Sequence, residues 1–241
     1  MPSDLEGKTI LLTGATGWLG SAMREGLVDQ GATVIGMGNS QHCEFQVDFY
    51  DTETLRDVLK DIVSLYPIDV LINNAWDLSA IDGWGETKED WMKAFECFYW
   101  NVVTTEVVGS YFEACESGKI INITSMYSRM SPDFAMYEGT RFSNCDSYGA
   151  TKASLTNYTK RTAAKLADYG VTCNSIAPGS FPDIVNKVKD TKFLLKLGNK
   201  TLLKRYGEPK DLVGMVAFLC SDDSDYITGK EFEVDGGWTN V

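Results

Sequence analysis

The sequence predicts an α/β fold: a doubly wound parallel sheet of about seven strands with helices on both faces. Apolar runs of strand length alternate with amphipathic runs of helix length from one end of the chain to the other. The predicted strands lie near 8–13, 33–37, 43–47, 69–73, 118–124, 171–177 and 231–235. The predicted helices lie near 19–30, 52–65, 87–116, 146–169 and 209–220. No repeat or linker divides the alternation, so we expect one domain over residues 1–241.

The first strand is followed by a glycine-rich loop. Residues 13–20 read TGATGWLG, and an amphipathic helix runs from there to about Gln30. Glycines between a first strand and a helix let the backbone approach a pyrophosphate, which then lies at the positive N-terminus of that helix. This predicts a dinucleotide site, with an ordinary tight turn as the alternative.

The second strand ends in Gly38-Asn39-Ser40. NAD-binding sheets commonly place an acidic residue here for the ribose hydroxyl, whereas NADP-binding sheets place a basic residue here or in the glycine loop. The lack of a carboxylate favours NADP. The lack of an arginine leaves NAD open.

Several motifs fall where other predicted strands end. Residues 73–75 (NNA), Ser125 and residues 178–179 (PG) each follow a strand, as the glycine loop does. Ligands of such sheets bind at the carboxyl ends of the strands. One crevice can therefore collect all these segments.

The helix near 146–169 opens with Tyr148 and Lys152, four residues apart. Two other Tyr/Lys pairs share this spacing, but Gly and Pro interrupt them, so only this pair shares the face of a continuous helix. An ammonium one turn from a phenol is expected to lower the phenol's pKa and ready it for proton exchange. A nearby hydroxyl, Ser125, can hold the same substrate oxygen.

Composition excludes several classes of function. With His42 as the only histidine and six cysteines lacking a C-x-x-C pair, neither Ser-His-Asp hydrolysis nor a metal site is expected. A formal charge of −12 argues against nucleic acids and anionic membranes as partners. The chain shows no signal peptide or apolar run of membrane-spanning length, so we expect a cytoplasmic protein.

Taken together, the motifs resemble the short-chain dehydrogenase/reductase family over nearly the whole chain. The pieces that carry the resemblance are TGATGWLG (13–20), NNA (73–75), INITS (121–125), Y-x-x-x-K (148–152), NSIAPG (174–179), ITGK (227–230) and VDGG (234–237). The length is typical of the single-domain branch. The glycine loop has the spacing of the extended branch, with Trp18 where single-domain members usually have Gly.

This resemblance implies a Rossmann fold and an NAD(P)-dependent oxidoreductase that interconverts a secondary alcohol and a ketone. It makes Tyr148 the acid/base, Ser125 the residue that orients the substrate, and Lys152 both the residue that lowers the Tyr148 pKa and a ribose ligand. The implied cofactor-binding residues are Gly14, Thr16, Gly17, Trp18, Leu19, Gly20, Asn39, Asp48, Asn74, Ala75, Tyr148, Lys152, Pro178 and Gly179. Asn73 matches a mainly structural position.

Two positions depart from the family pattern. Counted back from Ser125, the family's catalytic Asn falls near Phe98, with Asn101 three residues later. Asn101 could serve only if the helix is shifted by nearly a turn, and is otherwise a packing or surface residue. Asp183 stands where a nicotinamide-contacting Thr is usual.

The segment 126–147, between Ser125 and Tyr148, is roughly ten residues longer than the resemblance to the family would lead us to expect, and we call it the insertion. Its aromatic and charged residues, with Trp76 and Trp84 after the fourth strand, suit a hydroxylated ligand. We therefore expect a sugar, polyol or sugar-acid substrate; packing of the insertion on the sheet is the alternative. The candidate substrate residues are Trp76, Tyr127, Arg129, Tyr137 and Arg141. The stretch 132–140 also resembles a subgroup associated with flagellin modification and nonulosonic-acid sugars.

A lid is expected over about 180–206, where seven basic residues stand between 187 and 205 against Asp190 alone. It favours an anionic or carrier-bound substrate, hence the alternative of a 3-oxoacyl-[acyl-carrier-protein] reductase, although a solvated helix face explains it too. Another alternative is a dinucleotide-binding regulator or scaffold without catalysis. The resemblance also implies a homo-oligomer, either a dimer or a tetramer.

Overall fold

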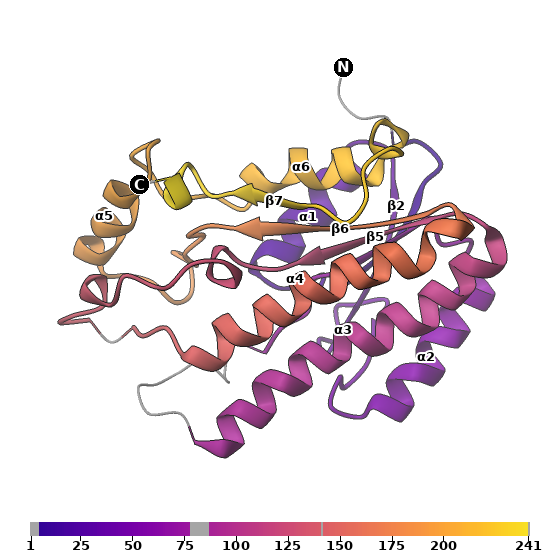
Figure 1. Ribbon diagram of the computed structural model, residues 1–241, viewed down its shortest axis with the longest axis horizontal. Helices are drawn as coiled ribbons and strands as arrows, with labels where there is room; N and C mark the ends of the chain where they lie inside the picture. Colours follow the sequence, from indigo (N-terminus) through magenta and orange to yellow (C-terminus); the bar gives the residue numbers. More distant parts are fainter. Residues whose placement is uncertain (1–4, 78–86, 141, 241) are drawn as a thin grey trace.

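Seven strands form one parallel sheet in the order β3-β2-β1-β4-β5-β6-β7 (Figure 1). The computed structural model describes residues 5–77, 87–140 and 142–240. The strands are β1 (Thr9–Thr13), β2 (Thr33–Gly38), β3 (Phe45–Gln46), β4 (Val70–Asn73), β5 (Gly118–Ile123), β6 (Val171–Pro178) and β7 (Glu231–Val234). The predicted fold class is confirmed.

Helices cover both faces of the sheet. They are α1 (Trp18–Val28), α2 (Thr52–Leu65), α3 (Lys88–Cys115), α4 (Asp146–Leu166), α5 (Thr191–Lys200) and α6 (Lys210–Cys220). Helices α2, α3 and α4 lie on one face, and α1 and α6 lie on the other (Figure 1). None of the helices in the described part of the chain has the length and apolarity needed to cross a bilayer.

The central strands β1 and β4 are almost entirely buried and largely apolar, as expected where both faces of a sheet are covered. Successive side chains of a strand point to opposite faces, so Leu11 and Ile120 join the core beneath α2, α3 and α4, whereas Ile10 and Ile121 join the core beneath α1 and α6. This two-sided burial holds the sheet in register, and all carboxyl ends reach the same edge.

A third apolar cluster lies at that edge, where helix α5 packs on the insertion. Phe193 and Leu197 of α5 contact Met136 and Tyr137 of the insertion and Trp238 near the C-terminus. The ring of Phe142 stacks on Phe193 at a centroid distance of 4.7 Å. The insertion and the lid therefore form one packed unit.

The structure differs from the predicted elements at one helix and one strand. Helix α5 was not among the expected helices; it begins where the Asp190 carboxylate accepts hydrogen bonds from the amides of Lys192 and Phe193. Strand β3 has only two residues rather than the five expected, because it is an edge strand paired with β2 alone.

Candidate active site

A cleft of about 600 Å³ lies at the carboxyl ends of the strands. Residues following β1, β2, β3, β4, β5 and β6 line it. All fourteen residues predicted to bind cofactor are among them: Gly14, Thr16, Gly17, Trp18, Leu19, Gly20, Asn39, Asp48, Asn74, Ala75, Tyr148, Lys152, Pro178 and Gly179. Ser125 and Trp76 line it as well. The structure thus brings together segments from across the sequence.

Two glycines are required by the conformation of the glycine loop. Gly14 has a φ of 66°, a conformation that side chains disfavour. A Cβ on Gly20 would lie 2.0 Å from the Gly14 carbonyl oxygen, so helix α1 can begin this close to β1 only with glycine there.

The first turn of α1 offers its positive end to the cleft. No side chain caps this end, and no acidic residue stands in the first turn. An uncapped helix N-terminus behind a glycine loop fits a pyrophosphate. The residues present therefore fit a dinucleotide.

Asn74 connects the end of β4 to this loop. Its side-chain amide donates to the carbonyl oxygens of Thr13 (3.0 Å) and Gly14 (3.2 Å). The Thr13 hydroxyl in turn accepts hydrogen bonds from the amides of Asn74 and Ala75, both at 2.9 Å. These contacts hold two walls of the cleft together.

Asn73 has the structural role that the sequence suggested. Its side chain is 1 % exposed and bonds to Asn122, Thr104 and Thr105. Asn174 likewise bonds the backbone of Ile227 and Lys230 beside β6. Neither is among the described residues that line the cleft.

Ser125, Tyr148 and Lys152 all line the cleft at the carboxyl ends of the strands. Ser125 follows β5, and its hydroxyl oxygen accepts a hydrogen bond from the Tyr127 amide at 3.2 Å and interacts with the Tyr148 phenol. Tyr148 and Lys152 lie one turn apart on α4, which is unbroken here. The Lys152 ammonium donates to the Ile123 carbonyl at 2.8 Å.

The Trp76 indole covers this pair. The Lys152 Nζ lies 3.9 Å from the centroid of the Trp76 ring, and the ring stands edge-on to Tyr148 at 5.9 Å. A cation over an indole face is stabilised by the ring's electrons. The buried Trp76 Nε1 has no hydrogen-bond partner among the described residues. Trp76 thus contacts Lys152 and Tyr148 directly.

Burial is the main cause of the pKa shifts of Lys152 and Tyr148. Burial lowers the pKa of Lys152 from 10.5 to about 7, because the ammonium is the form that loses hydration. Burial also raises the pKa of Tyr148, although the phenol keeps part of its surface open to the cleft. The net shift of the Tyr148 pKa is therefore upward, and the interaction that lowers it in this structure comes from the Ser125 hydroxyl. The Lys152 ammonium is directed at Ile123 and Trp76, and its predicted lowering of the Tyr148 pKa stays a prediction.

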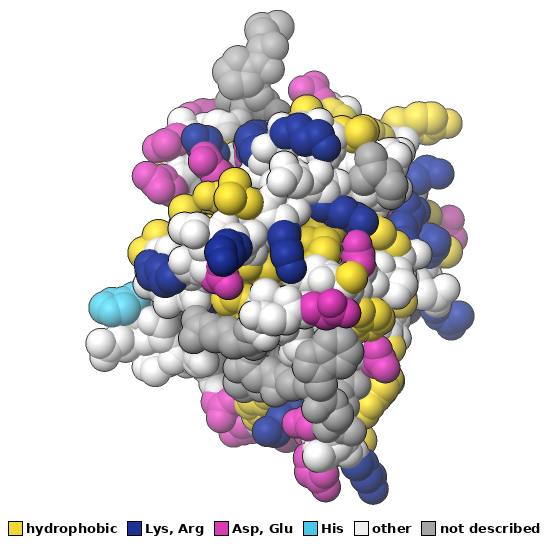
Figure 2. Space-filling model, turned by 90° about the vertical axis from the view of Figure 1, so that its left-hand side faces the viewer, with side chains coloured by type: hydrophobic (Ala, Val, Ile, Leu, Met, Phe, Trp, Pro, Cys, Tyr) yellow, Lys and Arg dark blue, Asp and Glu magenta, His cyan; other side chains and the backbone are white. Residues whose placement is uncertain are grey.

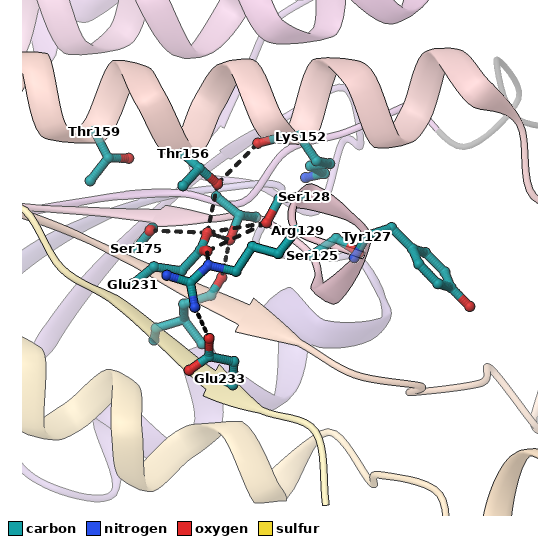
Figure 3. Close-up of polar contacts among 12 residues, drawn as sticks. Ser125, Tyr127, Ser128, Arg129, Lys152, Thr156, Thr159, Ser175, Glu231 and Glu233 are labelled. Atoms are coloured by element: carbon teal, nitrogen blue, oxygen red, sulfur yellow. Dashed lines mark hydrogen bonds and ion pairs between the residues drawn. The ribbon is translucent and has the colours of Figure 1, made fainter. Parts of the chain in front are cut away.

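Three predicted substrate residues are not among the described residues that line the cleft. The hydroxyls of Tyr127 and Tyr137 bond to each other at 3.0 Å within the third cluster, and burial raises the Tyr127 pKa. Arg129 points toward β7, where it pairs with Glu231 and Glu233 (Figure 3). All three make packing or anchoring contacts, but Tyr137 also lies near enough to Tyr148 to raise its pKa, so their contact with a substrate stays a prediction. The other candidates, Arg141 and Trp84, lie outside the described residues.

The two departures from the family pattern also have structural explanations. Asn101 is 4 % exposed, and its amide donates to the Cys97 carbonyl of its own helix at 2.7 Å. Phe98 packs edge-on against Tyr158. Asp183 accepts a hydrogen bond from the Asn186 amide and closes a turn. In this structure Asn101 is a packing residue, the alternative the sequence had left open.

Sequence reasoning missed an aromatic group among the residues that line the cleft. Trp100 packs against Phe49 at 5.3 Å and Tyr50 at 4.9 Å, and the Tyr50 hydroxyl donates to Asp77 at 2.9 Å. All four residues line the cleft. Phe49 and Tyr50, which directly follow Asp48 in the sequence, could have indicated that aromatic side chains lie here.

The basic residues of the lid are largely engaged locally. Lys200 bonds to Asp133 at 2.9 Å, Lys196 to the Met136 carbonyl at 3.3 Å, and Arg205 to Asp211. On the face that carries α5, Lys and Arg side chains are interspersed with acidic and apolar ones (Figure 2). At the cleft, the Trp18 indole donates to the Phe181 carbonyl at 3.2 Å and so joins the glycine loop to the lid.

Known proteins resemble this chain over nearly its whole length. The sequence profile of the family described as Enoyl-(Acyl carrier protein) reductase matches residues 13–239. A 3-oxoacyl-[acyl-carrier-protein] reductase of Vibrio harveyi is 30% identical over 259 residues, covering 97% of this chain and 98% of that protein. A 2-dehydro-3-deoxy-D-gluconate 5-dehydrogenase of Formosa agariphila is 30% identical over 266 residues, covering 97% and 93%.

Solved structures show the same fold. A gluconate 5-dehydrogenase from Burkholderia cenocepacia in complex with NADP and tartrate has a TM-score of 0.82 at 25% identity, covering 98% of this chain and 97% of that one. A short chain dehydrogenase from Leptospira borgpetersenii with bound NAD+ has a TM-score of 0.86 at 26% identity, covering 98% and 94%.

Lys152→Met should make the fold more stable at low pH. Between about pH 7 and 10.5 the unfolded chain binds more protons at Lys152 than the folded protein does, so burial of this group costs most below pH 7 and less as pH rises. The advantage of the Met variant should therefore be largest near pH 6. Since each pH unit between the two pKa values is worth about 1.4 kcal/mol, the advantage should shrink by at most about 5 kcal/mol by pH 10.5. Urea unfolding of both proteins across this range measures it, and a pH-independent difference would contradict the desolvation of Lys152.

Proposed function

This chain belongs to the short-chain dehydrogenase/reductase family of NAD(P)-dependent enzymes acting on CH–OH groups, and from this premise we propose that it interconverts a secondary alcohol and a ketone on a sugar, polyol or sugar acid. The observation that carries the proposal is the meeting of Ser125, Tyr148 and Lys152 in the same cleft as the glycine loop. When bound, the dinucleotide supplies or accepts the hydride.

The side chains of this site would handle the proton. With its pKa raised by burial, the Tyr148 phenol is protonated at neutral pH and suits the donation of a proton to a ketone oxygen. The Ser125 hydroxyl, which interacts with that phenol, would hold the same oxygen as its charge changes. In the reverse direction Tyr148 would accept the proton from the alcohol.

Lys152 would have two roles. As in the family, its ammonium would bind the nicotinamide ribose. Its charge, buried one turn from Tyr148 with the Nζ 5.7 Å from the phenol ring, would also stabilise the phenolate when the proton has left. Its pKa of about 7 would let it change charge near neutral pH.

We propose NADP as the preferred cofactor. The end of β2 that lines the cleft, Gly38 and Asn39, carries no carboxylate to repel a 2′-phosphate. Glu44, the nearest acid along the chain, pairs with Arg24 and accepts from the Gly36 amide. The gluconate 5-dehydrogenase complex with NADP supports this choice, although the Leptospira relative holds NAD+.

A sugar-acid substrate has support from two relatives named for gluconate-type substrates. The second candidate, reduction of a 3-oxoacyl group on a carrier protein, has support from the Vibrio harveyi relative. The basic lid lends it less support than the sequence implied, because several of its side chains are bound within the chain.

We also propose that the protein self-associates through α3. Met92, Phe95 and Tyr99 are between 43% and 53% exposed on this helix, an apolar set that a second copy could cover. Light scattering of the purified protein would test for a dimer or tetramer.

Tyr148→Phe should strongly lower the turnover rate without affecting cofactor binding. Loss of the proton donor should lower kcat by about 10² to 10⁴-fold, whereas the Kd for NADPH should stay essentially unchanged. The matched control is Tyr158→Phe on the same helix, which should keep full activity. Wild-type turnover in the Tyr148 variant would reject the assignment, and binding without turnover in the wild type would favour the regulator.

The cofactor preference follows from the end of β2. We expect a lower KM for NADPH than for NADH, and Asn39→Asp should reverse the order by repelling the 2′-phosphate. Steady-state kinetics with both cofactors measures this. A wild-type preference for NADH would contradict the proposal.

The substrate class can be separated by a direct comparison. Keto-sugar acids and 3-oxoacyl thioesters, supplied with NADPH at equal concentration, should give a higher kcat/KM for the sugar acids. A higher value for the thioesters would replace the first candidate with the second.

A further inference from the structure

The carboxylate of Glu231 is buried in the protein beside the candidate active site. Its side chain is 1% exposed, although it stands on β7, the edge strand of the sheet. Hydrogen-bond donors surround it: Thr124, Ser128, Arg129, Thr156 and Ser175 (Figure 3). A buried charge with this many donors is held in one orientation.

The shortest contacts come from two segments that carry the reacting side chains. The Thr124 hydroxyl donates to Glu231 Oε1 at 2.8 Å, and Thr124 directly precedes Ser125. The Thr156 hydroxyl donates to the same oxygen at 2.6 Å, and Thr156 stands one helical turn after Lys152 on α4. One carboxylate oxygen thus joins the end of β5 to the helix of Tyr148 and Lys152.

Each threonine hydroxyl has a single proton, so the choice of acceptor matters. The Thr124 oxygen lies 2.9 Å from the Ile176 carbonyl as well as 2.8 Å from Glu231, and the charged carboxylate is the stronger acceptor. The Thr156 oxygen also lies 3.2 Å from the Lys152 carbonyl, the usual acceptor for a threonine within a helix. The carboxylate is closer and charged, which makes it the stronger acceptor. Without it, the Thr156 proton would return to its own helix, and the link to β5 would be lost.

Arg129 completes the arrangement from the third side. The Arg129 Nε lies 2.7 Å from Glu231 Oε2, and its Nη1 pairs with Glu233. Arg129 directly follows the 3-10 turn Met126–Ser128, in which the Tyr127 amide donates to the Ser125 hydroxyl. The ion pair neutralises the buried charge and anchors the turn that Ser125 begins.

From these contacts we propose that Glu231 is a positioning residue for the reaction, a carboxylate that sets the placement of Ser125 relative to Tyr148 and Lys152. The inference rests on the proposed function. Glu231 touches neither the cleft nor the reacting groups among the described residues, so it acts through Thr124, Arg129 and Thr156. A substrate oxygen must be held by Ser125 and Tyr148 together, and small displacements of such groups are costly.

The main test compares Glu231→Gln with Glu233→Gln. Gln keeps the size of the side chain but removes the charge and presents an amide to donors. A displacement of reacting groups by about 1 Å can cost about 10²-fold in rate, so kcat should fall by up to about that factor in Glu231→Gln. The NADPH Kd should not change. Glu233→Gln, which removes the other carboxylate on Arg129, should keep wild-type kcat.

Thr156→Val and Thr159→Val form a second matched pair. Both replace a buried hydroxyl on α4 by a methyl group of similar size, but Thr159 accepts from Asn122 at 2.8 Å and does not contact Glu231. Both should lower Tm. Only Thr156→Val should lower kcat, and this pair decides the question if Glu231→Gln does not fold.

The pH profile supplies a readout that lost stability alone would not move. The interaction with Ser125 lowers the Tyr148 pKa, so misplacing Ser125 should raise that pKa and shift the Tyr148 limb of the kcat profile to higher pH in Glu231→Gln. Wild-type kcat and profile in Glu231→Gln or Thr156→Val, despite a lower Tm, would overturn the inference. Absence of turnover in the wild type with every alcohol and ketone tried would instead reject the proposed function, and this inference with it.

Discussion

The alignment of parallel strands at one edge is the constraint on which the site depends. Strands β1, β4, β5 and β6 run in the same direction, so the glycine loop, Asn74, Ser125 and Pro178 all leave the sheet at one place. Burial on both faces holds that alignment, because a shift of one residue would move each side chain from one packed core into the other, where it does not fit. The cleft is therefore a consequence of how the core packs.

Loss of water dominates the chemistry of the cleft. The Lys152 ammonium is held against the Ile123 carbonyl and beneath the Trp76 ring, and its pKa falls to about 7. Tyr148 has its pKa raised by the same dryness. A site of this kind can stabilise charge strongly at the moment it develops, because little water competes with the protein groups.

The predicted insertion and lid pack together as one unit at the carboxyl edge of the sheet. They share an apolar cluster with Trp238, and a Lys200–Asp133 ion pair joins them at the surface. Arg129 anchors the start of the insertion to β7. Arg129 and Lys200, two charged residues of the segments predicted to contact a substrate or carrier, thus hold this unit together. Trp76 and Phe181 line the cleft itself.

The sequence by itself determined the sheet, the glycine loop and the convergence of Ser125, Tyr148 and Lys152. Strand and helix periodicity is local, and an alternation of strands with helices implies parallel strands whose carboxyl ends meet at one edge. Tertiary structure alone decided which polar side chains face the cleft. Arg129 pairs with Glu231, far away in sequence, and the Tyr127 and Tyr137 hydroxyls bond to each other, since a buried charge or hydroxyl takes the nearest strong partner wherever the chain supplies it. The same reason explains the Tyr148 pKa, which spacing to Lys152 predicted would fall and which burial raises. Desolvation depends on everything packed around a group, and no spacing along the chain encodes that.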